Sequence, residues 1–300
     1  MIEVSGINKA FRKNDIIRDV SFSVKRGSIY GLLGSNGAGK TTIMRMIAGI
    51  LRQDTGSIFV LEQEVDENVS IKQRMVFIPD VLYFLPQYTM RQLANYYASF
   101  YDNWDEERYK NLIGLFHIDE KKKVSHFSKG LQRQVVFILS LSVKPNVLIL
   151  DEPFDGLDAV VRKKVRSLII QDVAERDMSV LLSSHNLREV EEICDHVGIL
   201  HQGEVLLERD LDELKEDVHK VQVAFKDSGE RLLAASDLKI LYKEKRGSVL
   251  LLIVKGDERK VMNEIEKFGP VLMDRLPLTL EEIFIYEMEG VGYAIENILV

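Results

Sequence analysis

Nine residues near the N-terminus have the types and spacing of a phosphate-binding loop. They fit the pattern G-x-x-x-x-G-K-S/T and are Gly34, Ser35, Asn36, Gly37, Ala38, Gly39, Lys40, Thr41 and Thr42. A buried-strand pattern precedes them at 28–33, and an apolar helical pattern follows at 41–51. In that context backbone N–H groups converge on phosphate oxygens, Lys40 reaches the β- and γ-phosphates, and the Thr41 hydroxyl ligates Mg²⁺. The loop therefore predicts nucleotide binding.

Two adjacent acids follow the most aliphatic stretch of the chain. Residues 147–150 predict a central parallel strand buried on both faces, and Asp151 and Glu152 come directly after it. Ligands bind at the carboxyl ends of strands in open α/β sheets. We expect Asp151 to hold Mg²⁺, directly or through water, and Glu152 to orient or deprotonate the attacking water. His185 ends another buried strand at the same edge. A histidine there is commonly structural, but a neutral imidazole could contact a γ-phosphate or its water.

Two further short segments accompany the acids. In 127–134, Ser128 is a good N-cap for the helix that follows, whose open amide end would face outward. Gly156, Leu157 and Asp158 follow the acids and precede a basic amphipathic helix at 159–176. Alone, the first segment indicates only a capped helix. The strand and the two acids downstream of it favour a functional role for the segment.

The remaining patterns predict the scaffold. Alternating residues at 2–11 and 17–25, with a turn at 12–16, predict antiparallel strands before the phosphate-binding loop. The block 88–142 has three helical patterns and reads as a helical insertion in an α/β core. Beyond residue 215 the patterns suggest a small α+β accessory domain. Its predicted elements are strands at 221–225, 249–254 and 271–276, a helix at 258–268, and a closing helix at 280–288 capped by Thr279. We therefore expect two domains, 1–214 and 215–300.

Composition sets outer bounds on the function. The 300 residues are 46 % hydrophobic and 29 % charged, which is ordinary for a globular chain. The net charge of −7 gives no hint of nucleic-acid affinity. Cys194 is the only cysteine, which excludes a disulfide within the chain and favours a reducing compartment. The N-terminus lacks a signal-peptide pattern, and the longest nearly apolar run, 135–143, is about half a membrane span. We expect the chain not to cross a membrane by itself.

The ordered set of motifs resembles the ATPase subunit of an ATP-binding cassette (ABC) transporter. The resemblance covers residues 1 to about 212 and rests on Phe11, the loop 34–42, a loop beginning at Asp80, the signature segment 127–134, Asp151-Glu152, 156–158 and His185. It implies a P-loop NTPase core with an antiparallel β subdomain and a helical subdomain at about 88–142. The Ser128-Lys129-Gly130 signature and the stretch 100–104 most resemble a bacterial subgroup associated with acetoin utilisation and peptide-antibiotic resistance.

The resemblance also implies a shared site. Two subunits, as a homodimer or a pair of ABC ATPase subunits, would sandwich two ATP molecules head to tail. Each ATP would contact the phosphate-binding loop of one subunit and Ser128 and Gly130 of the other, while Asp158 would monitor the opposite site. Phe11, a core aromatic in its plainest interpretation, would stack on adenine if it lies over the nucleotide.

The chain departs from the family pattern at three positions. Lys129 stands where glycine is usual, and Leu131 stands where glutamine is usual. Asp80 occupies the position of a glutamine that links Mg²⁺ to the permease contact. Aspartate is one methylene shorter and, when ionised, only accepts hydrogen bonds. Metal coordination by Asp80 is still expected, but its reach and therefore its coupling to the permease differ.

These observations favour a Mg²⁺-dependent ATPase subunit that powers transport through separate integral membrane permease subunits. It would lie in the cytoplasm, peripheral on the inner face of the cell membrane, and would not bind nucleic acid. The alternative is a soluble ABC ATPase acting on DNA or the ribosome. A single phosphate-binding loop, no long coiled coil and an acidic balance argue against it. The apolar stretch 82–88 is either packed under the helical insertion or a docking surface for the permease.

Overall fold

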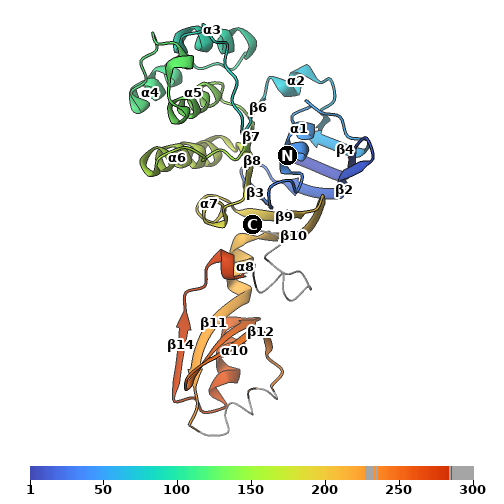
Figure 1. Ribbon diagram of the computed structural model, residues 1–300, viewed down its shortest axis with the longest axis vertical. Helices are drawn as coiled ribbons and strands as arrows, with labels where there is room; N and C mark the ends of the chain where they lie inside the picture. Colours follow the sequence, from blue (N-terminus) through green and yellow to red (C-terminus); the bar gives the residue numbers. More distant parts are fainter. Residues whose placement is uncertain (227–232, 234–235, 284, 286–300) are drawn as a thin grey trace. The chain divides into compact units, whose positions relative to one another are not determined.

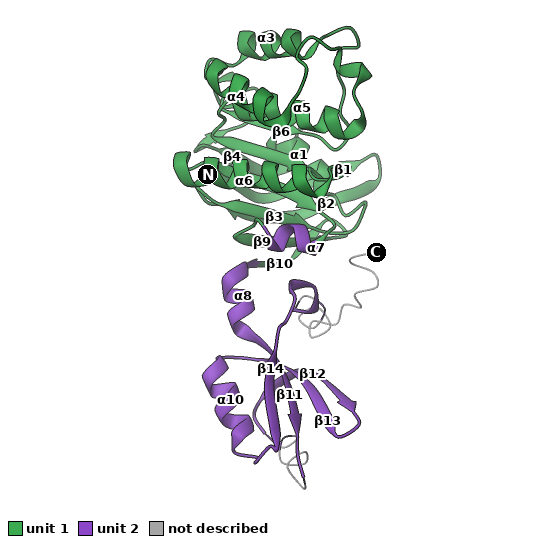
Figure 2. Cartoon of the chain, turned by 90° about the vertical axis from the view of Figure 1, so that its left-hand side faces the viewer, with its two compact units in different colours: residues 1–186, 193–208 green, residues 187–192, 209–300 purple. Residues whose placement is uncertain are grey.

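The computed structural model describes residues 1–226, 233, 236–283 and 285 of the chain (Figure 1). They cluster into two compact units (Figure 2). Unit 1 consists of residues 1–186 and 193–208, and unit 2 of residues 187–192 and 209–300. The domain boundary expected from the sequence, between residues 214 and 215, stays a prediction.

Unit 1 begins with an antiparallel sheet. Its order is β2-β1-β4-β5, with β1 at Ile2–Phe11, β2 at Asn14–Val24, β4 at Thr55–Val60 and β5 at Gln63–Glu64. The alternation in β1 and β2 points their apolar side chains into one core, as predicted. The turn is tighter than expected, because Phe11 pairs with Asn14 and Arg12 adopts a positive φ of 58°. The strand β2 therefore starts three residues earlier than its hydrophobic pattern, since its first residues are polar and exposed.

The second sheet of unit 1 carries the chemistry-bearing loops. Its order is β10-β9-β3-β8-β7-β6. The strands are β3 (Ile29–Leu33), β6 (Met75–Ile78), β7 (Val147–Asp151), β8 (Ser179–Ser184), β9 (His196–His201) and β10 (Glu204–Asp210). From β9 to β6 all neighbours are parallel. Asp151 pairs with Ser183 and Leu33 with Ser184, so the phosphate-binding loop, the acids and His185 leave the sheet at one edge. The predicted convergence is therefore observed.

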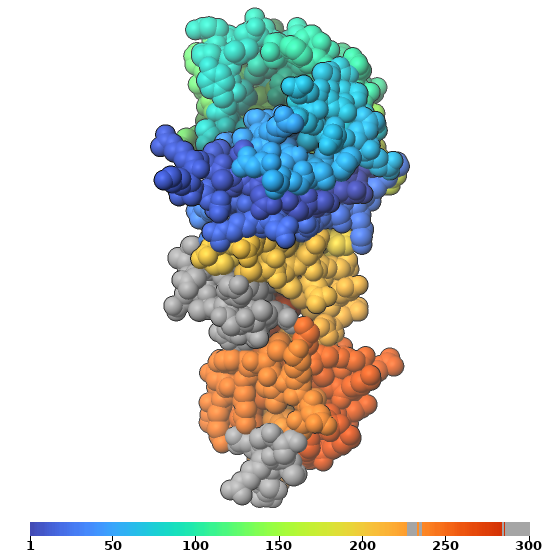
Figure 3. Space-filling view, turned by 90° about the vertical axis from the view of Figure 1, so that its right-hand side faces the viewer, coloured from blue at the N-terminus to red at the C-terminus, as the bar shows by residue number. Residues whose placement is uncertain are grey.

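Helices flank this sheet. The helix α1 (Lys40–Ile47) follows β3, a short α2 (Val69–Lys72) precedes β6, and α6 (Ala159–Arg176) follows β7. In Figure 3, the segments around β1 and β2 (blue) and α2 (cyan) lie side by side on one face of unit 1. Cys194 is buried, and this burial raises the pKa of its thiol well above the usual value. Among the described residues, every helix falls short of the length and apolar character that a membrane span requires.

The helical insertion contains the three helices that the sequence predicts. They are α3 (Met90–Phe100), α4 (Glu106–Phe116) and α5 (Lys129–Ser142), seen together at the top of Figure 1. A short 3₁₀ turn, η1 (Val124–His126), precedes α5. Side chains cap each N-terminus: Thr89 for α3, Asp105 for α4 and Ser128 for α5. Each cap satisfies an amide that the helix itself leaves unpaired, which explains where these helices start.

Unit 2 is an antiparallel sheet covered by a helix. The order is β12-β13-β11-β14, with β11 at Val218–Ala224, β12 at Lys239–Arg246, β13 at Val249–Lys255 and β14 at Leu272–Leu276. The helix α10 (Glu258–Glu266) contributes Val261 and Ile265 to a core with Val221, Val223 and Leu252. Unit 2 also contains α7 (Leu187–Glu191) and α8 (Leu211–Asp217).

The sequence predicted most, but not all, of unit 2. The patterns predicted β11, β13, β14 and α10 but not β12 and α8. These two elements contain many charged residues, so their hydrophobic periodicity is weak. The Thr279 hydroxyl accepts a hydrogen bond from the Glu282 amide, as expected of a cap. Residues 284 and 286–288 of the predicted helix 280–288 lie outside the described residues.

A buried charge network connects the helical insertion to the core of unit 1. Asp172 on α6 is fully buried and accepts hydrogen bonds from Arg108 on α4 at 2.6 Å and from Arg176 at 2.8 Å. Burying a carboxylate is costly unless such partners compensate it. The network therefore fixes α4 against α6.

We expect Asp172→Ala to lower Tm by on the order of 10 °C, because it leaves two largely buried guanidinium groups without their shared partner. Thermal melting measures the effect. The control is Arg52→Ala, which breaks a solvent-exposed pair with Asp66 at 3.3 Å and should change Tm little. Equal shifts for the two variants would contradict a structural role for the buried network.

Candidate nucleotide-hydrolysis site

A cavity of about 380 Å³ lies at the carboxyl edge of the parallel sheet in unit 1. It brings together residues that are up to 141 positions apart in the sequence, from Phe11 to Glu152. The lining residues are Phe11, Ile16, Ser35, Asn36, Gly37, Gly39, Lys40, Thr41, Thr42, Asp80 and Glu152. All but Ile16 were singled out from the sequence. Ile16 carried no signal beyond its place in the β1–β2 region.

Glycine is required at two positions of the phosphate-binding loop. A Cβ at Gly34 would lie 2.3 Å from the carbonyl oxygen of Leu200. Gly39 has φ of 111°, and a Cβ there would meet Ile17 at 2.5 Å. Gly39 is also the N-cap of α1, and no side chain caps this helix. The first amides of α1 are therefore left for a ligand at the end where the helix dipole favours an anion.

Backbone carbonyl oxygens hold Lys40 in place. It is only 6 % exposed, and its ammonium donates to the carbonyl oxygens of Gly34 at 2.6 Å and Ser35 at 3.2 Å. The same nitrogen lies 3.4 Å from Oε1 of Glu152. A buried ammonium needs oxygen partners of this kind, and phosphate oxygens are chemically equivalent ones. The environment of Lys40 therefore suits the phosphates of a nucleotide.

Three elements meet at the carboxylate of Asp151, which is almost completely buried. Its Oδ2 accepts a hydrogen bond from the Thr41 hydroxyl at 2.7 Å, and its Oδ1 accepts one from the Ser183 hydroxyl at 2.7 Å. Ser183 also accepts a hydrogen bond from the backbone amide of Glu152 at 2.9 Å. Sequence reasoning missed Ser183. The available signal was a serine at the polar end of an otherwise aliphatic strand, two residues before His185.

Glu152 is the best-placed candidate for a general base. Its Oε2 lies 3.0 Å from Nδ1 of His185, while its buried Oε1 has no hydrogen-bond partner. The residue adopts a left-handed φ of 45°, which costs a non-glycine residue about 1–3 kcal/mol. The bond from its amide to Ser183 helps to hold this conformation. A carboxylate on a strained backbone, with one oxygen that accepts no hydrogen bond, suits a site that is completed by water and phosphate.

The donor set fits Mg²⁺. Thr41 and Asp151 offer a hydroxyl and a carboxylate oxygen in direct contact, and Asp80 places a half-exposed carboxylate on the same cavity. Hard oxygen ligands of this kind, together with phosphate oxygens, are those that Mg²⁺ prefers. Glu152, Asp155 and His185 also present ligand atoms within 4.8 Å of one another. The contact between Glu152 and His185 already engages two of those three groups.

Other expected site residues lie elsewhere on the surface of unit 1. Ser128 and Asp158 are exposed, and each caps a helix by accepting an amide hydrogen bond, at 3.3 Å from Leu131 and 2.9 Å from Val161. Neither residue lines the cavity, and Gly130 does not line it either. A Cβ at Gly130 would lie 2.9 Å from the carbonyl oxygen of Gly156, so the signature turn packs closely on the loop before α6.

Phe11 is placed where a nucleotide base could contact it. Its ring lines the cavity and is 46 % exposed, so it is not the core aromatic of the plainest interpretation. The Lys9 ammonium lies 5.7 Å from the ring centroid and pairs with Asp54 at 2.6 Å. The exposed ring is thus held at the rim of the cavity.

The fold and the site together define a class of protein. A family model described as "ABC transporter" matches residues 17–155. The chain is 36 % identical to the ABC transporter ATP-binding protein YtrB of Bacillus subtilis (strain 168) over 97 % of its own length and 99 % of the relative. It therefore belongs to the family of ABC transporter ATP-binding proteins. The P-loop ATPase fold with an antiparallel β subdomain, expected from the sequence, is confirmed.

Two further similarities agree with this assignment. The chain is 34 % identical to the bacitracin transport ATP-binding protein BcrA of Bacillus licheniformis, over 72 % of this chain and 71 % of BcrA. A solved structure of an ATP binding subunit of an ABC transporter has a TM-score of 0.67 and 27 % identity, covering 72 % of this chain and 92 % of that one. The similarity to BcrA supports the predicted likeness to peptide-antibiotic-resistance ATPases. The relatives support a transport ATPase and not the DNA- or ribosome-acting alternative.

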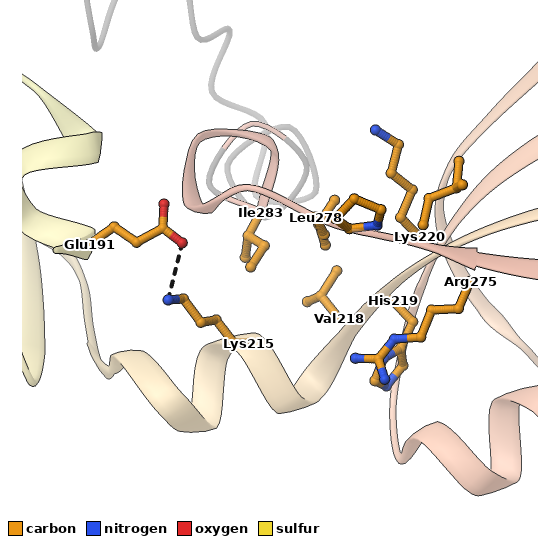
Figure 4. A pocket seen from close by; sticks show the side chains of 10 residues that line it. Glu191, Lys215, Val218, His219, Lys220, Arg275, Leu278 and Ile283 are labelled. Carbon is orange, nitrogen blue, oxygen red and sulfur yellow. Dashed lines mark ion pairs between the residues drawn. The ribbon is translucent and has the colours of Figure 1, made fainter.

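Unit 2 has a cavity of its own, of about 420 Å³ (Figure 4). Val218, Leu278 and Ile283 lie around it, and Lys215 points towards Glu191 at 3.0 Å. The other two cations of the lining also have carboxylate partners: Lys220 pairs with Glu282 and Arg275 with Glu258. This pairing favours a structural role, and we place the nucleotide chemistry in unit 1.

Ser183→Ala should lower the free energy of unfolding by about 1–3 kcal/mol, because it leaves Asp151 Oδ1 and the Glu152 amide without their partner. Chemical denaturation measures this. Ser140 provides a matched control, since it is equally buried but its hydroxyl has no hydrogen-bond partner. Ser140→Ala should therefore be neutral or slightly stabilising. An equal loss in both variants would mean that Ser183 contributes only packing.

Proposed function

We propose that this chain hydrolyses ATP in a Mg²⁺-dependent reaction and that the reaction powers transport through separate membrane subunits. The observation that carries the proposal is the position of Glu152. Glu152 lines the nucleotide cavity directly after Asp151, and its Oε1 accepts no hydrogen bond but forms an ion pair with the Lys40 ammonium. A base at that point can reach a water molecule in line with a terminal phosphate.

The residues divide the chemical work as follows. The amides of the phosphate-binding loop and Lys40 bind the β- and γ-phosphates, and Phe11 stacks on the adenine. Thr41, Asp151 and Asp80 hold Mg²⁺, which when bound neutralises charge on the phosphate oxygens. Glu152 accepts a proton from the attacking water as the bond to the leaving phosphate oxygen breaks. His185 orients Glu152 through their 3.0 Å contact.

The site is completed by a second subunit, either another copy or a paired ABC ATPase. The support is geometric: Ser128, Gly130 and Asp158 do not line the cavity of their own chain. Ser128 instead offers an exposed, capped helix N-terminus, which is suited to a γ-phosphate bound by another subunit. ATP would therefore join two chains, and hydrolysis would release them.

We place the contact with the membrane permease, at the inner face of the cell membrane, on an aromatic groove of unit 1. The groove, of about 420 Å³, is lined by Val69, Lys72, Gln73, Tyr96, Tyr97, Phe100 and Tyr101. Rings pack on each other there, with Tyr96 and Phe100 centroids 4.7 Å apart, and burial raises the pKa of Tyr97 to about 12. An apolar groove with large exposed side chains is typical of a docking surface. An amphipathic segment of a permease fits this chemistry.

The stretch 82–88, proposed from the sequence as a docking surface, adjoins this groove. Tyr83 is 84 % exposed, which excludes the core interpretation for that residue, whereas Leu82 and Phe84 are half-buried. Tyr88 makes an edge-to-face contact with Tyr96 at 6.3 Å, so the stretch and the groove form one surface. Its role in docking stays a prediction.

Glu152→Gln should slow ATP hydrolysis at least about a hundredfold, because glutamine cannot accept the proton. ATP binding should persist, and the variant should accumulate as an ATP-bound dimer. Phosphate release and size-exclusion chromatography with ATP measure the two effects. Glu62→Gln, at an exposed position outside the cavity, serves as the control and should retain normal turnover. Near-normal turnover of Glu152→Gln would move the base role elsewhere, with His185 the next candidate.

The shared site can be tested by mixing two inactive variants. Lys40→Ala removes the phosphate contact, and Ser128→Arg blocks the surface offered to the other subunit. A mixed dimer has one site with both defects and one site with neither, so mixing should restore part of the ATPase activity. Full activity of Ser128→Arg alone would contradict a site shared between subunits.

Phe100→Ser should weaken co-purification with the membrane permease and leave ATP binding intact. Because Phe100 is more than half exposed, its loss should change the free energy of unfolding by no more than about 0.5 kcal/mol. Ile170→Ser on α6 is the matched control, since Ile170 is a similarly exposed apolar residue outside the groove. Equal retention of the permease by both variants would remove the groove from the interface. Tyr83→Ser tests the adjoining stretch in the same assay.

A further inference from the structure

Arg133 is a buried cation in the second turn of α5, five residues after the cap Ser128. It is only 6 % exposed. Its Nη1 donates to the carbonyl oxygen of Pro79 at 3.0 Å, and its Nη2 donates to the carbonyl oxygen of Asp80 at 3.0 Å. The same Nη2 lies 3.5 Å from Oδ1 of Asp80. One side chain of the helical insertion thus holds two consecutive residues at the end of β6.

The backbone contacts outweigh the contact with the carboxylate. Both carbonyl bonds are at the ordinary N–H···O distance, whereas 3.5 Å is beyond the usual range for a strong hydrogen bond. The planar guanidinium fork matches two neighbouring carbonyl oxygens, which a lysine ammonium cannot engage with the same geometry. Arg133 therefore acts mainly on the backbone of Pro79 and Asp80 and not as a counter-ion for Asp80.

Asp80 lies between two cavities. One is the nucleotide cavity, and the other, of about 360 Å³, is lined by Asp80 together with Arg133 and Lys129. The Asp80 side chain is 52 % exposed, so packing alone does not fix its direction. The far end of the loop is held by Ser125, which donates to the carbonyl oxygen of Pro86 at 2.9 Å. Tyr83 lies between these two anchored ends of the loop and is exposed.

We infer that Arg133 is a positioning residue: by fixing the backbone of Pro79 and Asp80, it holds the Asp80 carboxylate at the metal side of the nucleotide cavity. The inference rests on the proposed function, in which Asp80 helps to hold Mg²⁺. Because aspartate is short, its reach depends on where its backbone lies, and Arg133 supplies that constraint. Ser128 caps the N-terminus of the same helix. The hydrogen bonds of Arg133 therefore also connect the surface proposed to face the second subunit with the side of the nucleotide cavity where Mg²⁺ would bind.

The test measures metal binding instead of turnover. Mn²⁺ replaces Mg²⁺, and its affinity for the chain with a non-hydrolysable ATP analogue is followed by electron paramagnetic resonance. Arg133→Gln should weaken Mn²⁺ binding about tenfold, the scale seen when a residue that orients a metal ligand is lost. Arg133→Lys keeps the charge and can reach one carbonyl oxygen, so it should have an intermediate effect. Chymotrypsin should cleave after Tyr83 faster in Arg133→Gln, because the hydrogen bonds that hold the start of this loop are lost.

A double-mutant comparison separates positioning from general structure. If Arg133 acts through Asp80, then Arg133→Gln should change Mn²⁺ affinity by less than about twofold when Asp80→Ala is already present. Arg74→Gln is the control: Arg74 also bonds an oxygen, Asn146 Oδ1 at 2.9 Å, but it is exposed and outside the cavity. It should leave Mn²⁺ affinity unchanged.

Each outcome has a defined meaning. Unchanged Mn²⁺ affinity in a folded Arg133→Gln variant would overturn the inference. So would an equal effect of Arg133→Gln with and without Asp80→Ala, because Arg133 would then act on the fold in general. If Arg133→Gln does not fold, the same comparisons with Arg133→Lys decide the question. Absence of nucleotide-dependent Mn²⁺ binding by the unaltered chain would instead refute the proposed function.

Discussion

The buried carboxylate of Asp151 is the interaction on which the functional edge of unit 1 depends. It ends β7 and accepts hydrogen bonds from Thr41 on α1 and from Ser183 on β8. An unpaired charge at this depth would cost far more than any single hydrogen bond returns. The three elements must therefore stay in register, and Lys40 and Glu152, each next in sequence to a member of this cluster, are positioned with them.

Local sequence patterns predicted the parts of the fold that short segments determine by themselves. The phosphate-binding loop is recognisable within one strand–turn–helix unit, in which Gly39 adopts a φ of 111° that favours glycine, and the cap Ser128 marks the start of α5. Edge elements were harder to predict. The strand β12 carries charged residues at most of its positions, because an edge strand can face water, and its hydrophobic pattern is correspondingly weak.

Most residues that line the cavity could be proposed from the sequence, but their contacts could not. Asp151, Glu152 and His185 could be proposed because each follows a buried strand. Ser183 and Arg133 could not, since their roles arise from partners 31 or more residues away that only the folded sheet brings near. Serine at a strand end and arginine on a helix are common types at common positions. Their importance lies in tertiary geometry, which spacing along the chain does not encode.

The burial of Cys194 has a practical consequence for spectroscopy. The chain has no other cysteine, and a thiol shielded from solvent with a raised pKa forms little of the thiolate that reacts with maleimides. The natural sequence therefore resembles a cysteine-free background. A cysteine introduced at an exposed position can carry a fluorophore or spin label with little competing reaction. The proposed approach of two subunits can then be tested as a change in distance, in protein that is otherwise unaltered.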